Sequence, residues 1–171
     1  MLDRILTLGD RVLQSLLDMV VIALSGLLLV LLNYAVFTRF ILNDSVSWSE
    51  ELPSHVLAVL AFIGAALLTR TNEHIGFDGV VRLAPPTIQR AVFALNLTLM
   101  TAFGVALAWY GGIAATSFGS RALISVDLPM GLFRAAMPLG GGLIALICGL
   151  RLVGLVTGRL GPEDLLPETD D

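Results

Sequence analysis

Side chains able to do chemistry are few in this chain, and several of them stand together. The segment in question reads Ser47, Trp48, Ser49, Glu50 and Glu51. Adjacent carboxylates at an otherwise apolar boundary are costly unless water, a cation or a helix N-terminus stabilises them. Ser47 with Glu50 fits a capping box, and Ser49 is an alternative N-cap. The segment therefore predicts a capped helix start at an interface, with both carboxylates as candidates to pair with Arg39 or with a partner protein.

A second polar segment begins about twenty positions later. It holds Arg70, Glu73, His74 and Asp78. The residues from 72 to 83 are too polar and too few to cross a bilayer, so they predict a short interfacial helix. Prolines 85 and 86 would end that helix, and Thr87 is placed to cap the next one.

Few residues in the chain could support redox or metal chemistry. Cys148 is the single cysteine, and His55 and His74 are the two histidines. Nineteen residues of helix would separate the histidines by about 28 Å, which is too far for one haem to bridge. The chain shows no phosphate-binding loop, metal-ligand cluster or nucleophile–base pair. We expect no catalytic residue, no metal, no cofactor of its own and no enzymatic activity.

Long apolar stretches must position these few polar groups. Hydrophobic residues make up 56% of the chain and charged residues 14%, against about a quarter charged in soluble domains. The stretches cover residues 16–38, 52–69, 91–115 and 133–157. Each is about the length that crosses a hydrocarbon core, and lipid forces the backbone into helices.

The predicted fold is all-α, with a single integral membrane domain over residues 1–160. It has four transmembrane helices and short interfacial helices. The leader from Leu2 to Leu17 is expected to lie on the membrane surface before the chain turns inward. The acidic residues 161–171 are expected to form a disordered tail.

The basic residues predict the orientation. All ten are arginines. One set lies at predicted inner ends: Arg4, Arg11, Arg70, Arg82, Arg90, Arg151 and Arg159. The smaller set lies at outer ends: Arg39, Arg121 and Arg134. The positive-inside rule therefore places both termini in the cytoplasm.

Small residues at helical spacing predict close helix contacts. The stripes are Ala58, Ala61 and Ala65 in the second span, and Gly104, Ala108 and Gly112 in the third. In the fourth span, Pro138 precedes glycines 140–142, which predicts a kink or a tight contact. Asn33 in the first span is expected to bond to a neighbouring helix. These small-residue surfaces are more than one small bundle needs for its own packing, and they indicate a larger membrane partner.

A complete transporter is not indicated. The span centres are nearly free of ionisable residues, and the two halves show no internal repeat, whereas transporters place such features at the bilayer midplane. The chain reads as one subunit of a larger assembly.

Several motifs in order carry a family resemblance. They are residues 39–43, 47–51, 62–66, Arg70, residues 73–75 and Asp78. At these spacings, and with four spans, the chain resembles the small membrane subunit, DctQ type, of tripartite ATP-independent periplasmic (TRAP) transporters. Phe40 departs from the tyrosine common in that family, and Pro53 and His55 replace other polar or aromatic residues.

The resemblance implies a non-catalytic subunit in a bacterial inner membrane. Such a subunit braces a large multi-span partner that carries the sodium-coupled pathway, and it helps a periplasmic solute-binding protein dock for uptake of an organic acid. Its partners would be these two proteins and the lipid bilayer, with no nucleic acid. The outer candidates are then Arg39 with residues 47–51, and the inner candidates are Arg70, Glu73, His74 and Asp78.

Two alternatives stay open from the sequence. The chain could be the membrane anchor or electron-transfer subunit of a respiratory enzyme complex, with haem or quinone ligands donated by another subunit. It could also be a self-assembling bundle with no role in transport.

Overall fold

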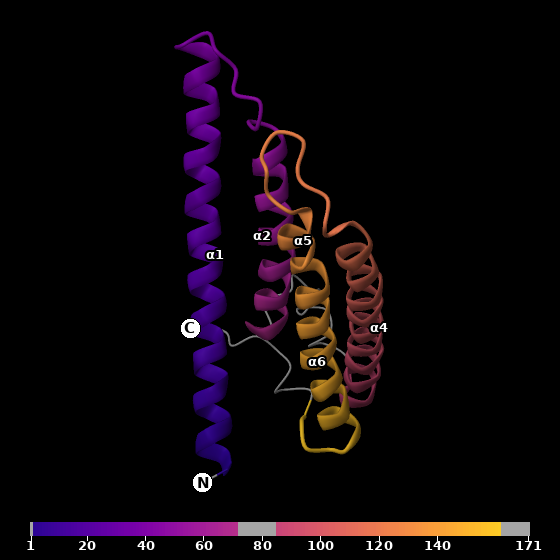
Figure 1. The fold of residues 1–171 in the computed structure, drawn as a ribbon. Coiled ribbons are helices and arrows are strands. Elements are labelled where there is room, and N and C mark those ends of the chain that lie inside the picture. The colour runs from indigo at the N-terminus through magenta and orange to yellow at the C-terminus, as the bar shows by residue number, and fades with distance from the viewer. Residues whose placement is uncertain (1, 72–84, 162–171) are drawn as a thin grey trace, which may run out of the picture.

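Long helices make up most of the structure. The computed structural model describes residues 2–71 and 85–161. Its helices are α1 (Leu2–Phe40), α2 (Glu51–Thr71), α4 (Pro86–Phe118), the short α5 (Met130–Arg134) and α6 (Ala136–Val156) (Figure 1). The described residues contain no β-strand, and one isolated bridge joins Ala122 to Pro129. The all-α prediction is confirmed.

Four segments are long and apolar enough to cross a membrane. They are Gln14–Phe40, Glu51–Arg70, Pro86–Phe118 and Met130–Val156. Each contains or closely matches one predicted stretch, so the four-span prediction is confirmed. The predicted interfacial helix over 72–83 and the tail from residue 162 onward lie outside the described residues.

The first helix is longer than predicted. It runs without a break from Leu2 to Phe40, a length of 39 residues, which corresponds to about 58 Å. The prediction that the chain turns between a surface leader and the first span is therefore wrong. No proline interrupts this stretch, so the backbone hydrogen bonds continue through it.

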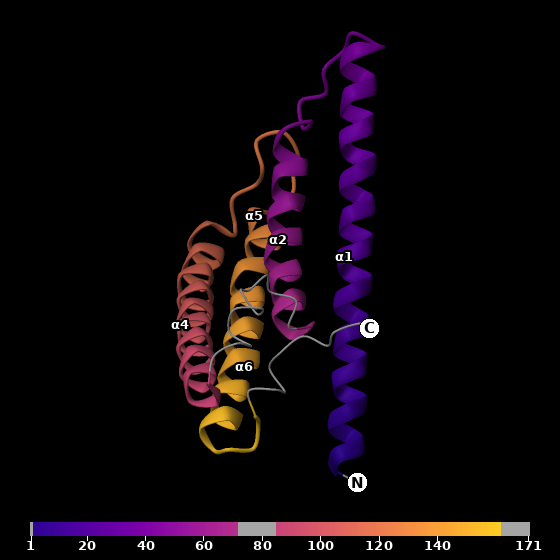
Figure 2. The ribbon, with the colours of Figure 1, turned by 180° about the vertical axis from the view of Figure 1, so that it is seen from behind.

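The helices are arranged in the order α1, α2, α6, α4. Both views show α6 between α2 and α4, with α1 on the far side of α2 (Figures 1 and 2). Contacts between α4 and α6, between α2 and α6, and between α1 and α2 agree with this order. A small core of Ala66, Leu97, Ile144, Cys148 and Leu155 lies between α2, α4 and α6.

Two adjacent glycines allow α6 to touch both neighbours at backbone distance. A Cβ atom on Gly140 would lie 2.6 Å from the carbonyl oxygen of Phe62 in α2. A Cβ on Gly141 would lie 2.7 Å from the amide nitrogen of Ala108 in α4. Successive helical residues point about 100° apart, so one glycine faces each helix. The tight contact predicted for this region is confirmed.

The small-residue stripes are only partly where the sequence placed them. Gly104 is buried, and a Cβ there would lie 2.7 Å from the Ala145 amide nitrogen, whereas nothing lies within 4 Å of Gly112. Gly111, one position earlier, makes the second close contact, with Pro138. This seam packs the chain against itself and is not an open surface for a partner.

The stripe in α2 shows the same shift. Ala58 and Ala61 are exposed, while Ala65 packs on the core and Ala66 is fully buried. The face that meets α6 is therefore centred on Phe62 and Ala66. Of the predicted stripe, Ala65 therefore lies on the packed side of α2, whereas Ala58 and Ala61 lie on its exposed side.

Prolines mark two helix starts. Pro138 lacks an N–H, so it cannot donate to the carbonyl of Arg134, and the helix is interrupted at Ala135 between α5 and α6. At α4, Pro86 is the first helical residue and no side chain caps the terminus. The predicted cap by Thr87 is therefore wrong, because Thr87 lies inside the helix.

The glycine seam yields a matched pair of variants. Gly104→Ala should lower the free energy of unfolding by about 1–3 kcal/mol, because the added methyl overlaps the α6 backbone. Gly112→Ala should leave it unchanged or raise it by up to about 1 kcal/mol, because alanine favours the helix and finds open space. Unfolding in a titration with sodium dodecyl sulfate, followed by tryptophan fluorescence, compares them. Equal effects of both variants would contradict the assigned seam.

Candidate functional site

The ends of α1 and α2 that meet at the 41–50 connection, which the arginine distribution predicts to face outward and which we call the outer ends, are joined by a short aromatic contact. The indole ring of Trp48 stacks on the ring of Tyr34 in α1, with centroids 5.8 Å apart and planes 10° apart. After α1, Asn43 adopts a positive φ of 52°, and the amide of Asp44 donates to the Thr38 carbonyl at 3.1 Å. Trp48 therefore anchors the connection to α1.

Glu51 holds the outer loop between α4 and α5. Its carboxylate accepts hydrogen bonds from the Ile124 amide at 3.0 Å and the Ser125 amide at 2.8 Å. The Ser125 hydroxyl donates to the same carboxylate. We name Glu51, Ile124 and Ser125 the outer clamp. Charge-assisted bonds of this kind are about twice as strong as neutral ones, so the start of α2 and this loop are held as one unit.

The predicted serine caps do not form. The α2 helix begins at Glu51, and the Leu52 amide donates to the Trp48 carbonyl at 3.1 Å. Within the described residues, no hydrogen bond joins the hydroxyl of Ser47 or Ser49 to the first turn. The capping box fails because α2 begins only at Glu51, so Ser47 lies four positions before the first helical residue, and its predicted partner Glu50 is exposed.

The expected pairing of Arg39 with the carboxylates is also absent from the described residues. The Arg39 guanidinium lies 6.0 Å from the ring centroid of Phe40. Glu50 is exposed, and Glu51 is engaged by the loop. Arg39 and Glu50 remain available at the outer surface.

Aromatic rings gather further groups at the outer end. His55 in α2 stacks on Phe133 in α5 with centroids 5.3 Å apart. The guanidinium groups of Arg121 and Arg134 each lie 5.0 Å from the ring of Phe118. Two outer arginines thus share one ring, which gives this end of α4 a local positive charge.

A second clamp lies at the opposite end of α2, which is predicted to face the cytoplasm and which we call the inner end. Arg151 in α6 donates from Nη1 to the Thr69 carbonyl at 2.8 Å and from Nη2 to the Arg70 carbonyl at 2.6 Å. The last carbonyls of a helix have no partner within it, and they carry partial negative charge. We name Arg151 with these two carbonyls the inner clamp. Its guanidinium supplies hydrogen-bond donors to the carbonyls and a positive charge at the negative end of the helix.

Sequence reasoning missed the inner clamp. It treated Arg151 as one of several basic residues at the inner side and assigned the inner site to Arg70, Glu73, His74 and Asp78. The last three lie outside the described residues. A signal was present, because Arg151 is spaced three residues after Cys148 and four before Leu155, on the buried face of α6.

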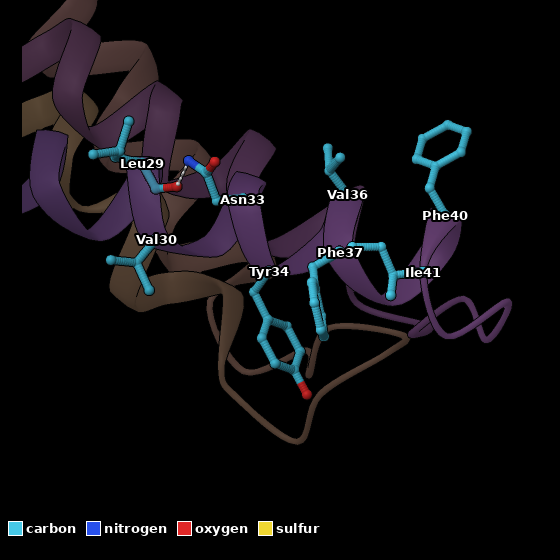
Figure 3. A pocket seen from close by; sticks show the side chains of 8 residues that line it. All are labelled: Leu29, Val30, Asn33, Tyr34, Val36, Phe37, Phe40 and Ile41. Carbon is cyan, nitrogen blue, oxygen red and sulfur yellow. Dashed lines mark hydrogen bonds between the residues drawn. The ribbon is translucent and has the colours of Figure 1, made fainter.

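The C-terminal half of α1 presents a shallow, open apolar face, and Figure 3 shows the side chains that line it. They are Leu29, Val30, Asn33, Tyr34, Val36, Phe37, Phe40 and Ile41. Asn33 is exposed and donates from Nδ2 to its own helix, at the Leu29 carbonyl 2.7 Å away. Among the described residues, the predicted bond from Asn33 to a neighbouring helix is not formed.

Metal-binding chemistry finds no support in the described part of the chain. Across residues 2–71 and 85–161 no group of three or more histidine, cysteine or acidic side chains could hold an ion. The polar groups that do converge, in the two clamps, bind backbone and so connect elements of the fold.

Comparison with known proteins gives a consistent result. Residues 28–158 match the family described as tripartite ATP-independent periplasmic transporters, DctQ component. The sialic acid TRAP transporter small permease protein of Vibrio cholerae is 22% identical over 132 residues, which are 77% of this chain and 76% of that protein.

Two further relatives point the same way. The C4-dicarboxylate TRAP transporter small permease protein of Vibrio cholerae is 27% identical over 78 residues, 45% of this chain and 34% of that protein. A Haemophilus influenzae protein named for the same class of small permease subunit is 26% identical over 141 residues, 82% of this chain and 87% of its own length.

The outer clamp predicts the behaviour of the loop. Glu51→Gln should speed amide exchange at Ile124 and Ser125 by about ten- to a hundred-fold, because hydrogen bonds to a charged group contribute about 1.5–3 kcal/mol. Hydrogen–deuterium exchange in lipid nanodiscs measures this. Glu50→Gln removes the same charge from an exposed position and serves as the control. Unchanged exchange in the Glu51 variant would rule out the clamp.

The inner clamp predicts a loss of stability. Arg151→Met should lower the free energy of unfolding by about 1.5–3 kcal/mol, because two helix-terminal carbonyls lose a charged donor. Arg151→Lys should lose less, since one ammonium group can still reach a carbonyl. Arg159→Met, at an exposed position, should stay within about 0.5 kcal/mol of the native protein. Detergent unfolding compares the three, and equal stability of the Arg151 and Arg159 variants would refute the clamp.

Proposed function

Since this chain belongs to the DctQ component family of tripartite ATP-independent periplasmic transporters, we propose that it braces the large subunit of such a transporter. The large subunit would carry the sodium-coupled pathway. The small chain would also help a periplasmic solute-binding protein dock at the outer surface. The cargo we propose is an organic acid.

The family and the four spans define the setting. The chain is a multi-pass protein of the bacterial inner membrane and a small permease subunit, and its family is not enzymatic. This family assignment replaces two alternatives, the membrane anchor of a respiratory enzyme and the self-assembling bundle with no role in transport. Both termini are proposed to be cytoplasmic, because seven of the ten arginines fall on the same side of the predicted spans as the termini, and the arginine-rich side faces the cytoplasm.

The observation that carries the bracing role is the double clamping of α2. The outer clamp ties its first turn to the loop between α4 and α5, and the inner clamp ties its last turn to α6. Glycine contacts hold the middle of the same helix against α6. A unit restrained at both ends and in the middle suits a part that must stay fixed while a partner moves.

The docking role is supported by the outer surface. The outer clamp holds the loop that carries Ile124, whose side chain is 95% exposed. Glu50, which precedes Glu51, and Arg121, three residues before Ile124, are also exposed. A fixed loop with an exposed apolar residue and charged neighbours has the composition of a protein contact.

The proposed cargo class follows from the relatives. One is named for sialic acid and another for C4-dicarboxylates, and both names denote organic acids. The bound solute itself is expected to contact the binding protein and the large subunit.

Uptake tests the function directly. Proteoliposomes that contain the large subunit without this chain should take up little labelled organic acid in the presence of binding protein, sodium and a panel of sialic acid and dicarboxylates. Adding the chain should restore uptake. Glu50→Gln combined with Glu51→Gln should lower uptake by about ten-fold, equivalent to roughly 1.4 kcal/mol of lost docking free energy, while membrane insertion is unchanged. Full uptake without the chain would refute the proposal.

A further inference from the structure

Two arginine side chains converge on one aromatic ring at the outer end of α4. The guanidinium carbons of Arg121, in the loop, and Arg134, at the end of α5, each lie 5.0 Å from the centroid of the Phe118 ring. The two cations are therefore no more than twice that distance apart, which is comparable with the Debye length of about 8 Å in physiological salt. Like charges at this separation repel each other, and an anion in contact with both would stabilise them.

The described part of the chain does not supply this anion. Among the described residues, neither guanidinium lies within ion-pair distance of a carboxylate. Glu51, whose carboxylate is held against the same loop, is occupied by the loop amides. Arg134 directs Nη2 to the Met130 sulfur at 3.8 Å, and a thioether sulfur is a weak acceptor. Within the described residues, most N–H donors of the pair are therefore open to a ligand.

Backbone hydrogen bonds fix the positions of both arginines. The Met130 amide donates to the Arg121 carbonyl at 2.8 Å, and the Gly131 amide donates to the Gly119 carbonyl at 3.1 Å. These bonds join the start of α5 to the end of α4, and Arg134 lies one turn further along α5. Because the main chain is already held, binding of an anion orders little beyond the two side chains.

The depth of the pair in the membrane indicates the kind of anion. Helices α6 and α4 meet at Pro138 and Gly111, where an added Cβ on the glycine would lie 2.8 Å from the proline nitrogen. Trp109 and Tyr110 are exposed directly before that glycine, and such residues gather at headgroup level. Arg134 precedes Pro138 by four residues, which places it about 6 Å further toward the outer surface. Since a headgroup layer is about 5–8 Å thick, the pair lies at the depth of lipid phosphates.

We propose that Arg121 and Arg134 bind the phosphate group of an anionic phospholipid in the outer leaflet. Guanidinium groups form paired, charge-assisted hydrogen bonds with phosphate oxygens. The ring of Phe118 holds the two cations side by side through cation–π contacts, near enough to share one headgroup. An anionic lipid suits the pair better than a zwitterionic one, because the ammonium group of a zwitterionic lipid compensates its own phosphate.

The bound lipid ties the loop between α4 and α5 to the membrane surface. The outer clamp joins that same loop to the start of α2, so the lipid fixes the height of this end of the bundle in the bilayer. The site is independent of the proposed function, because it requires only the two arginines and the membrane around them.

Native mass spectrometry of the full-length chain in detergent, titrated with phosphatidylglycerol, tests the site. Arg121→Gln combined with Arg134→Gln should weaken lipid binding about five- to thirty-fold. Arg39→Gln combined with Arg159→Gln is the matched control, because it removes two charges from exposed positions, and it should keep the native affinity. The double lysine variant, Arg121→Lys with Arg134→Lys, should keep part of the affinity, because lysine retains the charge without the planar fork.

Competing probes identify the ligand. Phosphatidylcholine should bind more weakly than phosphatidylglycerol, and a large molar excess of inorganic phosphate should not displace the lipid. Equal lipid binding in the glutamine double variant at Arg121 and Arg134 and in its control would overturn the proposal. Displacement by inorganic phosphate would also overturn it, because the site would then take free anions. Unchanged lipid binding with a loss of affinity for the periplasmic binding protein would assign the pair to a protein carboxylate and would equally overturn it.

Discussion

Backbone contact at two neighbouring glycines is the constraint on which this structure depends. Gly140 brings α6 against α2, and Gly141 brings it against α4. Larger side chains at these positions would push the helices apart and remove the close packing between them. The close spacing also decides which polar groups meet. Arg151 reaches the end of α2 because α2 and α6 run so near each other.

Hydrogen bonds at the two ends of α2 add to the restraint that the glycine contacts provide. Membrane helices satisfy their own backbone along most of their length but not at their ends. In α2, the last carbonyls accept from Arg151, and Glu51 at the first turn accepts from a loop that follows α4. Three of the four long helices therefore form a restrained unit. Their small core and end contacts give the unit a fixed shape.

The first helix has a different character. It packs mainly against α2 and carries an exposed apolar face that includes Asn33. Most of its side chains from residue 14 onward are exposed, in contrast to the restrained unit formed by the other three long helices.

Sequence reasoning succeeded where the membrane itself imposes the answer. Apolar length predicts spans because lipid forces each one into a helix, and ordered motifs around Arg39, Glu51 and Arg70 indicated the family. The glycines after Pro138 indicated a tight contact, which the structure confirms. These features depend on local composition, so the chain displays them without knowledge of its neighbours.

Partners across the fold could not be read in the same way. The sequence placed Glu51 beside Arg39 and gave Arg151 no specific role, whereas the folded chain joins Glu51 to Ser125 and Arg151 to the end of α2. It also chose Gly112 over Gly111. The sequence by itself determined the helices, the membrane and the family. Only the tertiary structure decided which face of each helix meets another, because a rotation of about 100° between adjacent residues changes the partner without changing the composition.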